Sequence, residues 1–438
     1  MIDGVNININ NLPDANAGGA VNLKDIFGTD SDDLIRITKT ANDQYDVMVR
    51  NSTGTQHSYY SAQQLTSFNV HGGGGNDTIE IGEGVLVDNI FAGDGNDSVL
   101  NKGTVKDLNG NAGDNKIENY GTIGSIAMGN GNDRITNKET GKIASIDGGA
   151  GADRLDNYGE VGTVNTQEGT GQVINNGTIS TLLMGSGSDS LTNTGSIKNA
   201  HLGDGDNAII NSGIIDSATT GNGNDKINND PGGTISKLVT GQGLDNIYNK
   251  AQLGEVQLGS GDDKLTNKAA INTVNSADGN DIIENAVGGT IKVVNAGSGS
   301  DKIYNGGHID EAYIGESYLD NNKGTIGRVI TGNDKATINN KGTIDKIAKE
   351  SDLRREVLLR RYSDASDVIS KGSEVLVKAD EQLISILNDL SANVNTSARK
   401  VGEIAKVNQE LSNTISAVAQ SISSAKQNDQ KLTGAQTR

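Results

Sequence analysis

The sequence predicts a mainly β protein: a parallel β-solenoid, of the β-roll or β-helix type with 18 residues per coil, followed by a C-terminal α-helical coiled-coil segment. Three observations lead to this prediction. An aliphatic residue framed by Gly, Asp and Asn recurs at intervals of 18 or 20 residues, 59 of the 438 residues are Gly, and only three are Phe while none is Trp. So little bulk excludes a thick globular core and favours a thin core that repeats along a rod.

One complete copy of the repeat is GNGNDRITN, in which Gly129, Gly131 and Asp133 precede Ile135 and Asn137 follows it. The second half of each unit reads NxGTIxxL, a spacing that does not match the helical period of about 3.6 residues. Because Gly, Asn and Asp accept positive φ, we predict turns at the Gly-rich segments and short strands between them. With a rise of about 4.8 Å per coil, the stack would form a rod about 70 Å long.

The repeat divides the chain into four predicted segments. Residues 1–20, which are almost uncharged, form a disordered, possible secretion segment, and residues 21–72 form an N-terminal β cap over the exposed sheet edge. Residues 73–349 are the solenoid repeats. Residues 350–438, where Gly nearly vanishes, are a helical oligomerisation segment with a disordered tail.

Charge and composition exclude several classes of function. The net charge is −19, and the first 350 residues hold 25 Lys and Arg against 45 Asp and Glu, so we expect no nucleic-acid partner. The absence of Cys excludes disulfides and thiol catalysis. The N-terminus has neither the basic nor the apolar region of a Sec signal peptide, and no apolar run is long enough for a transmembrane segment. A secreted or cell-surface location would therefore require another export route.

The half-unit GxGxDxI resembles the glycine-rich nonapeptide of RTX (repeats-in-toxin) proteins, G-G-x-G-x-D-x-U-x, at its second, fourth, sixth and eighth positions. In that family the turns of a parallel β-roll bind Ca²⁺ through the Asp carboxylate and backbone carbonyls. The resemblance implies calcium along one edge of the rod only, because the second half of each coil carries NxGTI instead, which is similar to the coils of bacterial adhesin β-helices. Since Ca²⁺ prefers about six to eight oxygen ligands, motifs on successive coils must combine to complete a site.

The predicted calcium ligands are the two glycines and the aspartate of each motif. They are Gly73, Gly75, Asp77, Gly93, Gly95, Asp97, Gly129, Gly131, Asp133, Gly149, Gly151, Asp153, Gly185, Gly187, Asp189, Gly221, Gly223, Asp225, Gly241, Gly243, Asp245, Gly259, Gly261, Asp263, Gly279, Asp281, Gly297, Gly299 and Asp301. Ala277 replaces the first glycine in one motif. We expect little metal where Asn115, Gly171 and Asn207 hold the aspartate position, and we leave out the looser acidic turn that contains Asp33.

A metal-free alternative remains open for the same turns, because Asn, Asp and Gly also stack into hydrogen-bonded ladders. The asparagines that follow the aliphatic position, such as Asn137, Asn193, Asn249 and Asn305, fit a structural ladder better than a metal site. The four histidines are scattered over unrelated coils, so we predict no catalytic site and no enzyme activity, with a carbohydrate-active β-helix as the alternative.

In the C-terminal segment a heptad pattern runs over residues 383–422, with Asn408 in the seam. It predicts a homo-oligomer, and a helical hairpin is the alternative. The segment is similar to the helices of type III secretion tip and filament proteins. We therefore expect a secreted bacterial calcium-binding β-solenoid that acts as an extracellular structural, filament or adhesion protein. The alternative is a type III secreted effector or translocation-associated protein whose helix contacts the secretion apparatus or a host membrane.

Overall fold

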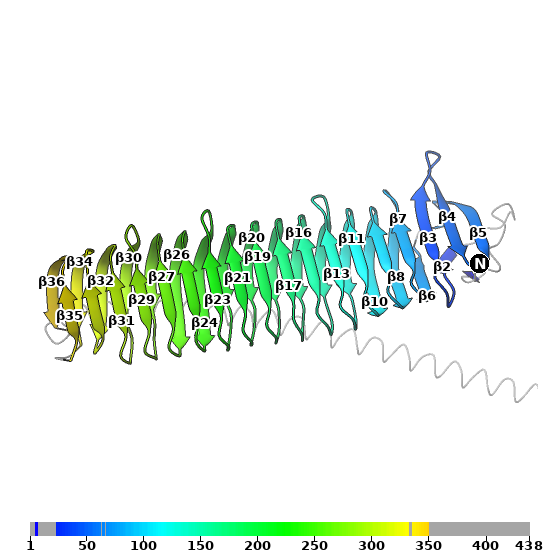
Figure 1. The fold of residues 1–438 in the computed structure, drawn as a ribbon. Helices are drawn as coiled ribbons and strands as arrows, with labels where there is room; N and C mark the ends of the chain where they lie inside the picture. Colours follow the sequence, from blue (N-terminus) through cyan, green and yellow to red (C-terminus); the bar gives the residue numbers. More distant parts are fainter. Residues whose placement is uncertain (1–4, 8–22, 63, 66, 333–334, 350–438) are drawn as a thin grey trace, which may run out of the picture. The chain divides into compact units, whose positions relative to one another are not determined.

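The computed structural model describes residues 5–7, 23–62, 64, 65, 67–332 and 335–349, all within the unit Met1–Asp352. These residues form a parallel β-solenoid of about 16 coils, as the 18-residue repeat predicts (Figure 1). No helix occurs among them, and none therefore has the length and apolar character needed to cross a bilayer. The predicted helical segment 350–438, with its coiled coil at 383–422, lies outside the described residues.

Each coil contributes one strand to each of two sheets, here called sheet A and sheet B. The strands of sheet A are β1 Val5–Ile7, β2 Leu23–Phe27, β6 Asn69–Gly74, β8 Leu86–Asp94, β10 Thr104–Ala112, β12 Thr122–Ala127, β14 Lys142–Asp147, β16 Glu160–Asn165, β18 Thr178–Leu183, β20 Ser196–His201, β22 Ile214–Thr219, β24 Thr234–Gln242, β26 Gln252–Ser260, β28 Ala270–Asn275, β30 Thr290–Asn295, β32 His308–Gly315, β34 Thr325–Thr331 and β36 Thr343–Lys349. The strands of sheet B are β3 Leu34–Lys39, β4 Gln44–Asn51, β5 Gly54–Ser61, β7 Thr78–Ile81, β9 Ser98–Asn101, β11 Lys116–Asn119, β13 Arg134–Asn137, β15 Arg154–Asn157, β17 Gln172–Asn175, β19 Ser190–Asn193, β21 Ala208–Asn211, β23 Lys226–Asn229, β25 Asn246–Asn249, β27 Lys264–Asn267, β29 Ile282–Asn285, β31 Lys302–Asn305, β33 Tyr318–Asn321 and β35 Thr337–Asn340.

The core is thin because each coil turns few side chains inward: alternate residues in the short strands of sheet B and residues three apart in strands of sheet A such as β12. In β13 the inward residues are Ile135 and Asn137, which pair in parallel register with Leu155 and Asn157 of β15. Sheet A contributes two further aliphatic residues per coil, such as Ile123 and Ile126 of β12. Each coil therefore buries its apolar side chains mainly against the coils before and after it.

The asparagines of sheet B form a continuous ladder that is buried from Asn101 to Asn321, as predicted for Asn137, Asn193, Asn249 and Asn305. Each Nδ2 donates to the Oδ1 of the next asparagine at 2.7–2.9 Å, from Asn101 to Asn340. Each side-chain amide polarises the neighbouring amides along the ladder. It also closes the turn that follows its short strand. The ladder thus fixes the register of every coil in this part of the chain.

The Gly-rich turns are shorter than the sequence predicts. The positions of the nonapeptide G-G-x-G-x-D-x-U-x show this. In β6, β8, β10, β24 and β26 the sheet A strand continues through its second and third positions, and only its fourth and fifth positions form a bend. Gly129 and Gly131 have φ values of 95° and 144°, where an L side chain is strained. Ala277 nevertheless takes a φ of 66° in place of a glycine.

The first coil lies inside the segment 21–72 for which we predict a cap. Strand β2 pairs in parallel with β6, and β3 pairs in parallel with β7, so the solenoid register begins at Leu23 instead of residue 73. Strands β4 and β5 are an antiparallel extension of β3 and interrupt the repeat. Strand β1 pairs with β2, so the predicted disordered segment 1–20 contains a strand at Val5–Ile7.

Candidate metal site in the aspartate column

The predicted aspartates lie one above another along the edge where sheet A turns into sheet B. We call this line the aspartate column; its positions are held by Asp33, Asp77, Asp97, Asn115, Asp133, Asp153, Gly171, Asp189, Asn207, Asp225, Asp245, Asp263, Asp281 and Asp301. Every aspartate in it is buried, with at most 6% of its surface exposed. The column includes Asp33, which the sequence reasoning left out, because β2 and β3 form the first coil.

One carboxylate oxygen of each aspartate links neighbouring coils. Oδ1 of Asp245 accepts the backbone N–H of Asp225 at 2.8 Å, and Oδ1 of Asp263 accepts that of Asp245 at 2.8 Å. Asn115 and Asn207 keep the same bond through their Oδ1 atoms, each at 2.9 Å from the donor nitrogen. This contact therefore requires a carbonyl-type oxygen but no negative charge.

In nine aspartates of the column the other carboxylate oxygen has no hydrogen-bond partner. The exceptions are Asp301, whose Oδ2 accepts the Ser317 hydroxyl at 2.8 Å, and Asp33, whose Oδ2 accepts the Thr29 N–H at 2.5 Å. Oδ2 is buried and without a partner in Asp77, Asp97, Asp133, Asp153, Asp189, Asp225, Asp245, Asp263 and Asp281. Burial raises the pKa of Asp77 and Asp263 to about 7, because desolvation disfavours the charged form. The same cause raises the pKa of Asp133, Asp189, Asp225 and Asp281 to about 6 and shifts those of Asp97, Asp153, Asp245 and Asp301 in the same direction.

Asn207 shows what surrounds this second oxygen. Its Nδ2 donates to the carbonyl oxygens of Gly203 at 2.9 Å, Gly205 at 3.0 Å and Thr220 at 2.9 Å. The three acceptors come from the motif of its own coil and from the next coil. By the same register, Oδ2 of an aspartate would take the place of this amide nitrogen, where an ionised carboxylate has no proton to donate to the carbonyls.

The asparagine and aspartate side chains do occupy equivalent places. A Cβ built on Gly72 would lie 2.5 Å from Oδ2 of Asp77, and one built on Gly110 would lie 3.0 Å from Nδ2 of Asn115. Both glycines are five residues before the column residue. The terminal atom therefore points in the same direction whether it is an amide nitrogen or a carboxylate oxygen.

An ionised aspartate in this position is unstable without a positive charge. Two carboxylates about 4.8 Å apart repel each other by about 3–4 kcal/mol at an effective dielectric constant of about 20, and Asp225, Asp245, Asp263, Asp281 and Asp301 are consecutive. Facing carbonyl oxygens add to this repulsion. Either a cation between the oxygens or a proton on each carboxyl group relieves it, and a carboxylate with several carbonyls is the ligand set that Ca²⁺ prefers.

Residues five positions before the aspartate add oxygen atoms that sequence reasoning missed. The hydroxyls of Thr220, Thr240 and Ser276 contact the carboxylates of Asp225, Asp245 and Asp281. The Thr220 hydroxyl donates to the Thr240 carbonyl at 3.1 Å. Its contact with Asp225 lowers the pKa of that carboxyl group and offsets part of the rise caused by burial. A periodic search does not reveal these hydroxyls, because Met128 and Met184 hold the same position in other coils.

The predicted glycines contribute their backbone only. No group of three or more His, Asp or Glu side chains that could hold a metal occurs in the described ranges, so a cation in the column would depend on main-chain carbonyls and one carboxylate per coil. Part of this main chain already bonds across coils: the Gly129 carbonyl accepts the N–H of Ala150 at 2.9 Å, and the Ala150 carbonyl accepts the N–H of Gly131 at 2.9 Å. Each carbonyl retains a second lone pair for a ligand.

With this geometry in view, the chain was compared with known proteins. No family model, no curated protein and no solved structure matches it. The resemblance to RTX proteins therefore rests on the motif alone, and function has to be argued from the column and the surface.

The raised pKa values predict how the metal-free protein responds to pH. The folded protein binds protons at Asp77 and Asp263 up to a pH of about 7, whereas the unfolded chain releases them near its ordinary pKa of 3.8. Stability from these groups is therefore complete below about pH 4 and is lost progressively as the pH rises from there to the folded pKa of about 7. After metal removal on a chelating resin, we expect the melting temperature to fall by roughly 10 °C between about pH 5 and pH 8.

Saturating calcium supplies the control for this measurement. A cation that neutralises the carboxylates should abolish the fall in melting temperature at higher pH. The melting temperatures with and without calcium should therefore agree at low pH and differ clearly above pH 6. A metal-free protein that becomes more stable from pH 5 to pH 8 would show that the column is not protonated in this range.

Proposed function

We propose that this protein is a secreted, calcium-stabilised β-solenoid that serves as an extracellular structural or attachment rod. The observation that carries the proposal is the contrast between Asn207, whose Nδ2 donates to three carbonyl oxygens, and nine aspartates of the column, whose Oδ2 atoms have no hydrogen-bond partner. Calcium supplies the missing positive charge at the aspartate coils. The five coils from Asp225 to Asp301 are the strongest part of the column, because their carboxylates are consecutive.

Several features support a rod that folds where calcium is abundant. The core of each coil depends on its neighbours, so a cation between coils acts directly on stacking. The hydroxyls of Thr220 and Thr240 add oxygen atoms beside two of the consecutive aspartates, Asp225 and Asp245. Homo-oligomerisation through residues 383–422 remains part of the proposal. The type III alternative depends on the same terminal residues, which lie outside the described part of the chain.

The test is thermal unfolding of the full chain, followed by circular dichroism at pH 7.5 in chelator and in increasing calcium. A ligand present at about a hundred times its Kd stabilises by about 3 kcal/mol per site, so several occupied coils should raise the melting temperature by roughly 10 °C or more. Magnesium should have a much smaller effect, because it demands a tighter octahedral shell than stacked carbonyls provide. A melting temperature that does not respond to calcium would contradict the proposal and leave a metal-free rod with protonated aspartates.

A further inference from the structure

The outward face of sheet B carries a charge opposite to that of the chain. From β9 to β33, the first and third residues of each four-residue strand and the residue after it point outward. These positions hold ten Lys and Arg against five Asp and Glu, whereas the first 350 residues as a whole hold 25 against 45. The stacking of coils therefore collects scattered basic residues on one flat face of an acidic rod.

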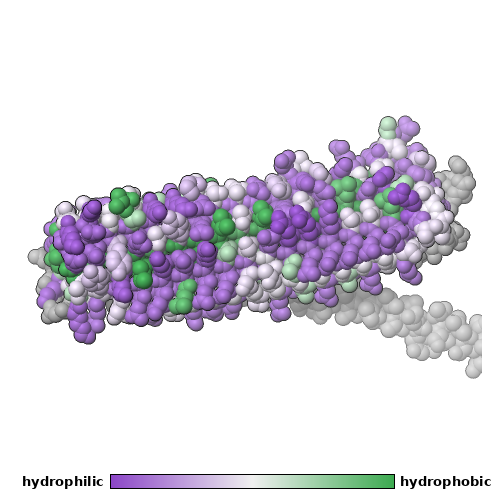
Figure 2. Space-filling model, viewed as in Figure 1, coloured by the Kyte–Doolittle hydropathy of each residue, from purple (hydrophilic) through white to green (hydrophobic). Residues whose placement is uncertain are grey.

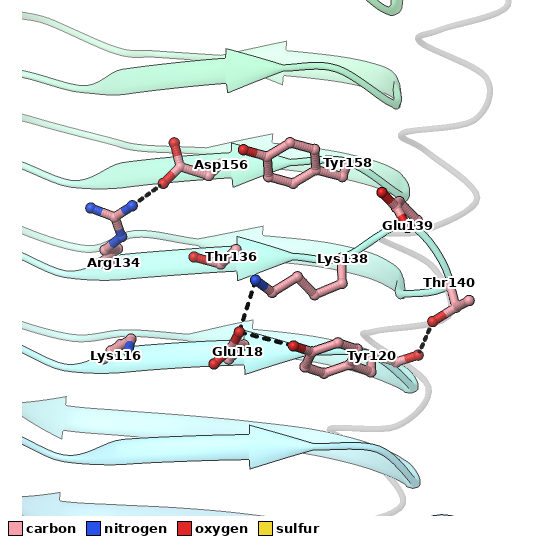
Figure 3. Close-up of a pocket in the computed structure, with 10 residues that line it drawn as sticks. All are labelled: Lys116, Glu118, Tyr120, Arg134, Thr136, Lys138, Glu139, Thr140, Asp156 and Tyr158. Carbon is pink, nitrogen blue, oxygen red and sulfur yellow. Dashed lines mark hydrogen bonds and ion pairs between the residues drawn. The ribbon is translucent and has the colours of Figure 1, made fainter.

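Two grooves cross this face. The tyrosine groove, lined by side chains of β11, β13 and β15 including Tyr120 and Tyr158, has a volume of about 700 Å³ (Figure 3). The lysine groove, lined by Lys226, Tyr248, Lys264, Lys268 and Glu284 among others, has a volume of about 460 Å³. Figure 2 shows a largely hydrophilic surface on one side of the molecule. Both grooves are lined by charged and polar side chains and tyrosines, so they do not fit an apolar partner.

In the tyrosine groove two of the three lining carboxylates, Glu118 and Asp156, are paired with a cation, and the third, Glu139, is exposed. Glu118 forms an ion pair with Lys138 at 2.8 Å, and Asp156 forms one with Arg134 at 2.5 Å (Figure 3). Lys138 pairing lowers the pKa of Glu118 below its ordinary value, so this carboxyl group remains ionised and is no proton donor. The groove offers half-exposed tyrosine rings and fixed polar groups, which suits binding better than proton-transfer chemistry.

The lysine groove has an excess of positive charge that no neighbour cancels. Lys226 and Lys264 are exposed and form no ion pair with any residue that the structure describes, and Glu284 is the only carboxylate in the lining. Lys268 lies over the ring of Tyr248, with Nζ 5.1 Å from the centroid, so the tyrosine holds this ammonium group in place. Three ammonium groups around one groove form a site for an anion.

The two grooves lie on one straight line. The sheet order places six coil steps between β13 and β25, which is about 29 Å along the rod. Between them the outward residues of β17, β19 and β21 are uncharged, including Gln172, Ser190 and Ala208. A ligand that uses both grooves must therefore be long and extended, with anionic groups set apart from one another.

We propose that the outward face of sheet B binds an acidic polysaccharide along the rod axis, with Lys226 and Lys264 contacting its anionic groups and the tyrosine groove receiving sugar rings farther along the same polysaccharide. A nucleic acid carries a phosphate about every 3.4 Å per strand and would meet the carboxylates Glu118, Asp156 and Glu284 on this face. A glycan spaces its charges by one or more rings and offers hydroxyls to the Asn and Thr side chains of both grooves. This site lies on the opposite side of the strands from the core, and it does not depend on calcium in the aspartate column.

The experiment measures binding of the full chain to oligogalacturonate, a carboxylated probe, and to chondroitin sulfate, a sulfated one. Lys226→Glu with Lys264→Glu should weaken binding by about tenfold or more, because two attractive contacts become repulsive. Lys198→Glu with Lys292→Glu makes the same change of net charge at exposed positions of sheet A and should alter binding less than about twofold. Binding should persist in chelator under conditions where circular dichroism shows a folded rod, which separates this proposal from the calcium proposal.

Other outcomes would overturn the proposal. Equal losses in the two double variants would mean that only net charge matters, and the absence of binding to both probes would exclude this ligand class. Binding of a single-stranded oligonucleotide at least as tight as that of the glycans would assign the face to nucleic acid instead. Circular dichroism of both double variants, with unchanged β signal, ensures that a loss of binding is not a loss of fold.

Discussion

Asn249→Asp is expected to destabilise the rod severely, by about 3–5 kcal/mol at neutral pH. The Nδ2 of Asn249 donates to the Ala251 carbonyl and to Oδ1 of Asn267, both at 2.8 Å. An aspartate there would place a second oxygen against these acceptors, in a site with no exposure to water. The loss includes both the missing donor bonds and the desolvation of a buried charge.

The measurement is chemical denaturation of the full chain, and the matched control is Asn246→Asp. Asn246 is on the same strand, β25, but its side chain is exposed, so the same chemical change should cost less than about 0.5 kcal/mol. The difference should shrink at low pH, where a protonated carboxyl group in place of the Asn249 amide regains a donor. Similar effects for the two variants would show that the asparagine ladder does not determine stability.

The sequence is sufficient to predict the features that recur in every coil. The 18-residue spacing of Ile135, Leu155 and their equivalents predicts parallel stacking, and the regular asparagines predict the ladder of sheet B. Both follow from a repeat because each coil sees the same neighbours above and below. The column of aspartates is predictable for the same reason, since residues in one frame of the repeat must lie on one line.

Features that interrupt the repeat were not predictable in this way. Asp33 and Asp77 are 44 residues apart because β4 and β5 are inserted between them, so the first coil does not show the period. Thr220 and Thr240 lie in a frame that other coils fill with Met, and their contact with the carboxylates appears only in the folded coil. The grooves of sheet B likewise depend on which residues differ between coils, and a periodic pattern hides these differences.

The reverse exchange, from aspartate to asparagine in the aspartate column, should have the opposite effect on stability to that of Asn249→Asp. Replacing both Asp245 and Asp263 with Asn should make the calcium-free protein more stable and reduce its response to calcium. The amide retains the Oδ1 contact, as Asn207 does, and adds an Nδ2 that donates to the facing carbonyls. At pH 8 the exchange also removes the Asp263 carboxylate, whose pKa is raised to about 7 in the folded protein. Ionising this group costs about 4 kcal/mol more in the folded protein than in the unfolded chain.

Melting of the double variant in chelator at pH 8 should therefore occur roughly 10 °C above the unmodified protein, and added calcium should raise it less. Asp216→Asn with Asp345→Asn is the control, because it removes the same charge at exposed positions of sheet A and should leave both the melting temperature and the calcium response nearly unchanged. A second comparison uses Ala in place of Asn at 245 and 263. Alanine removes the charge but also the Oδ1 acceptor of the Asp225 and Asp245 N–H groups, so its expected effect is destabilising. If the Asn variant melts below the unmodified protein and keeps its full calcium response, the facing carbonyls do not require a positive charge or a donor, and the case for a cation in the column fails.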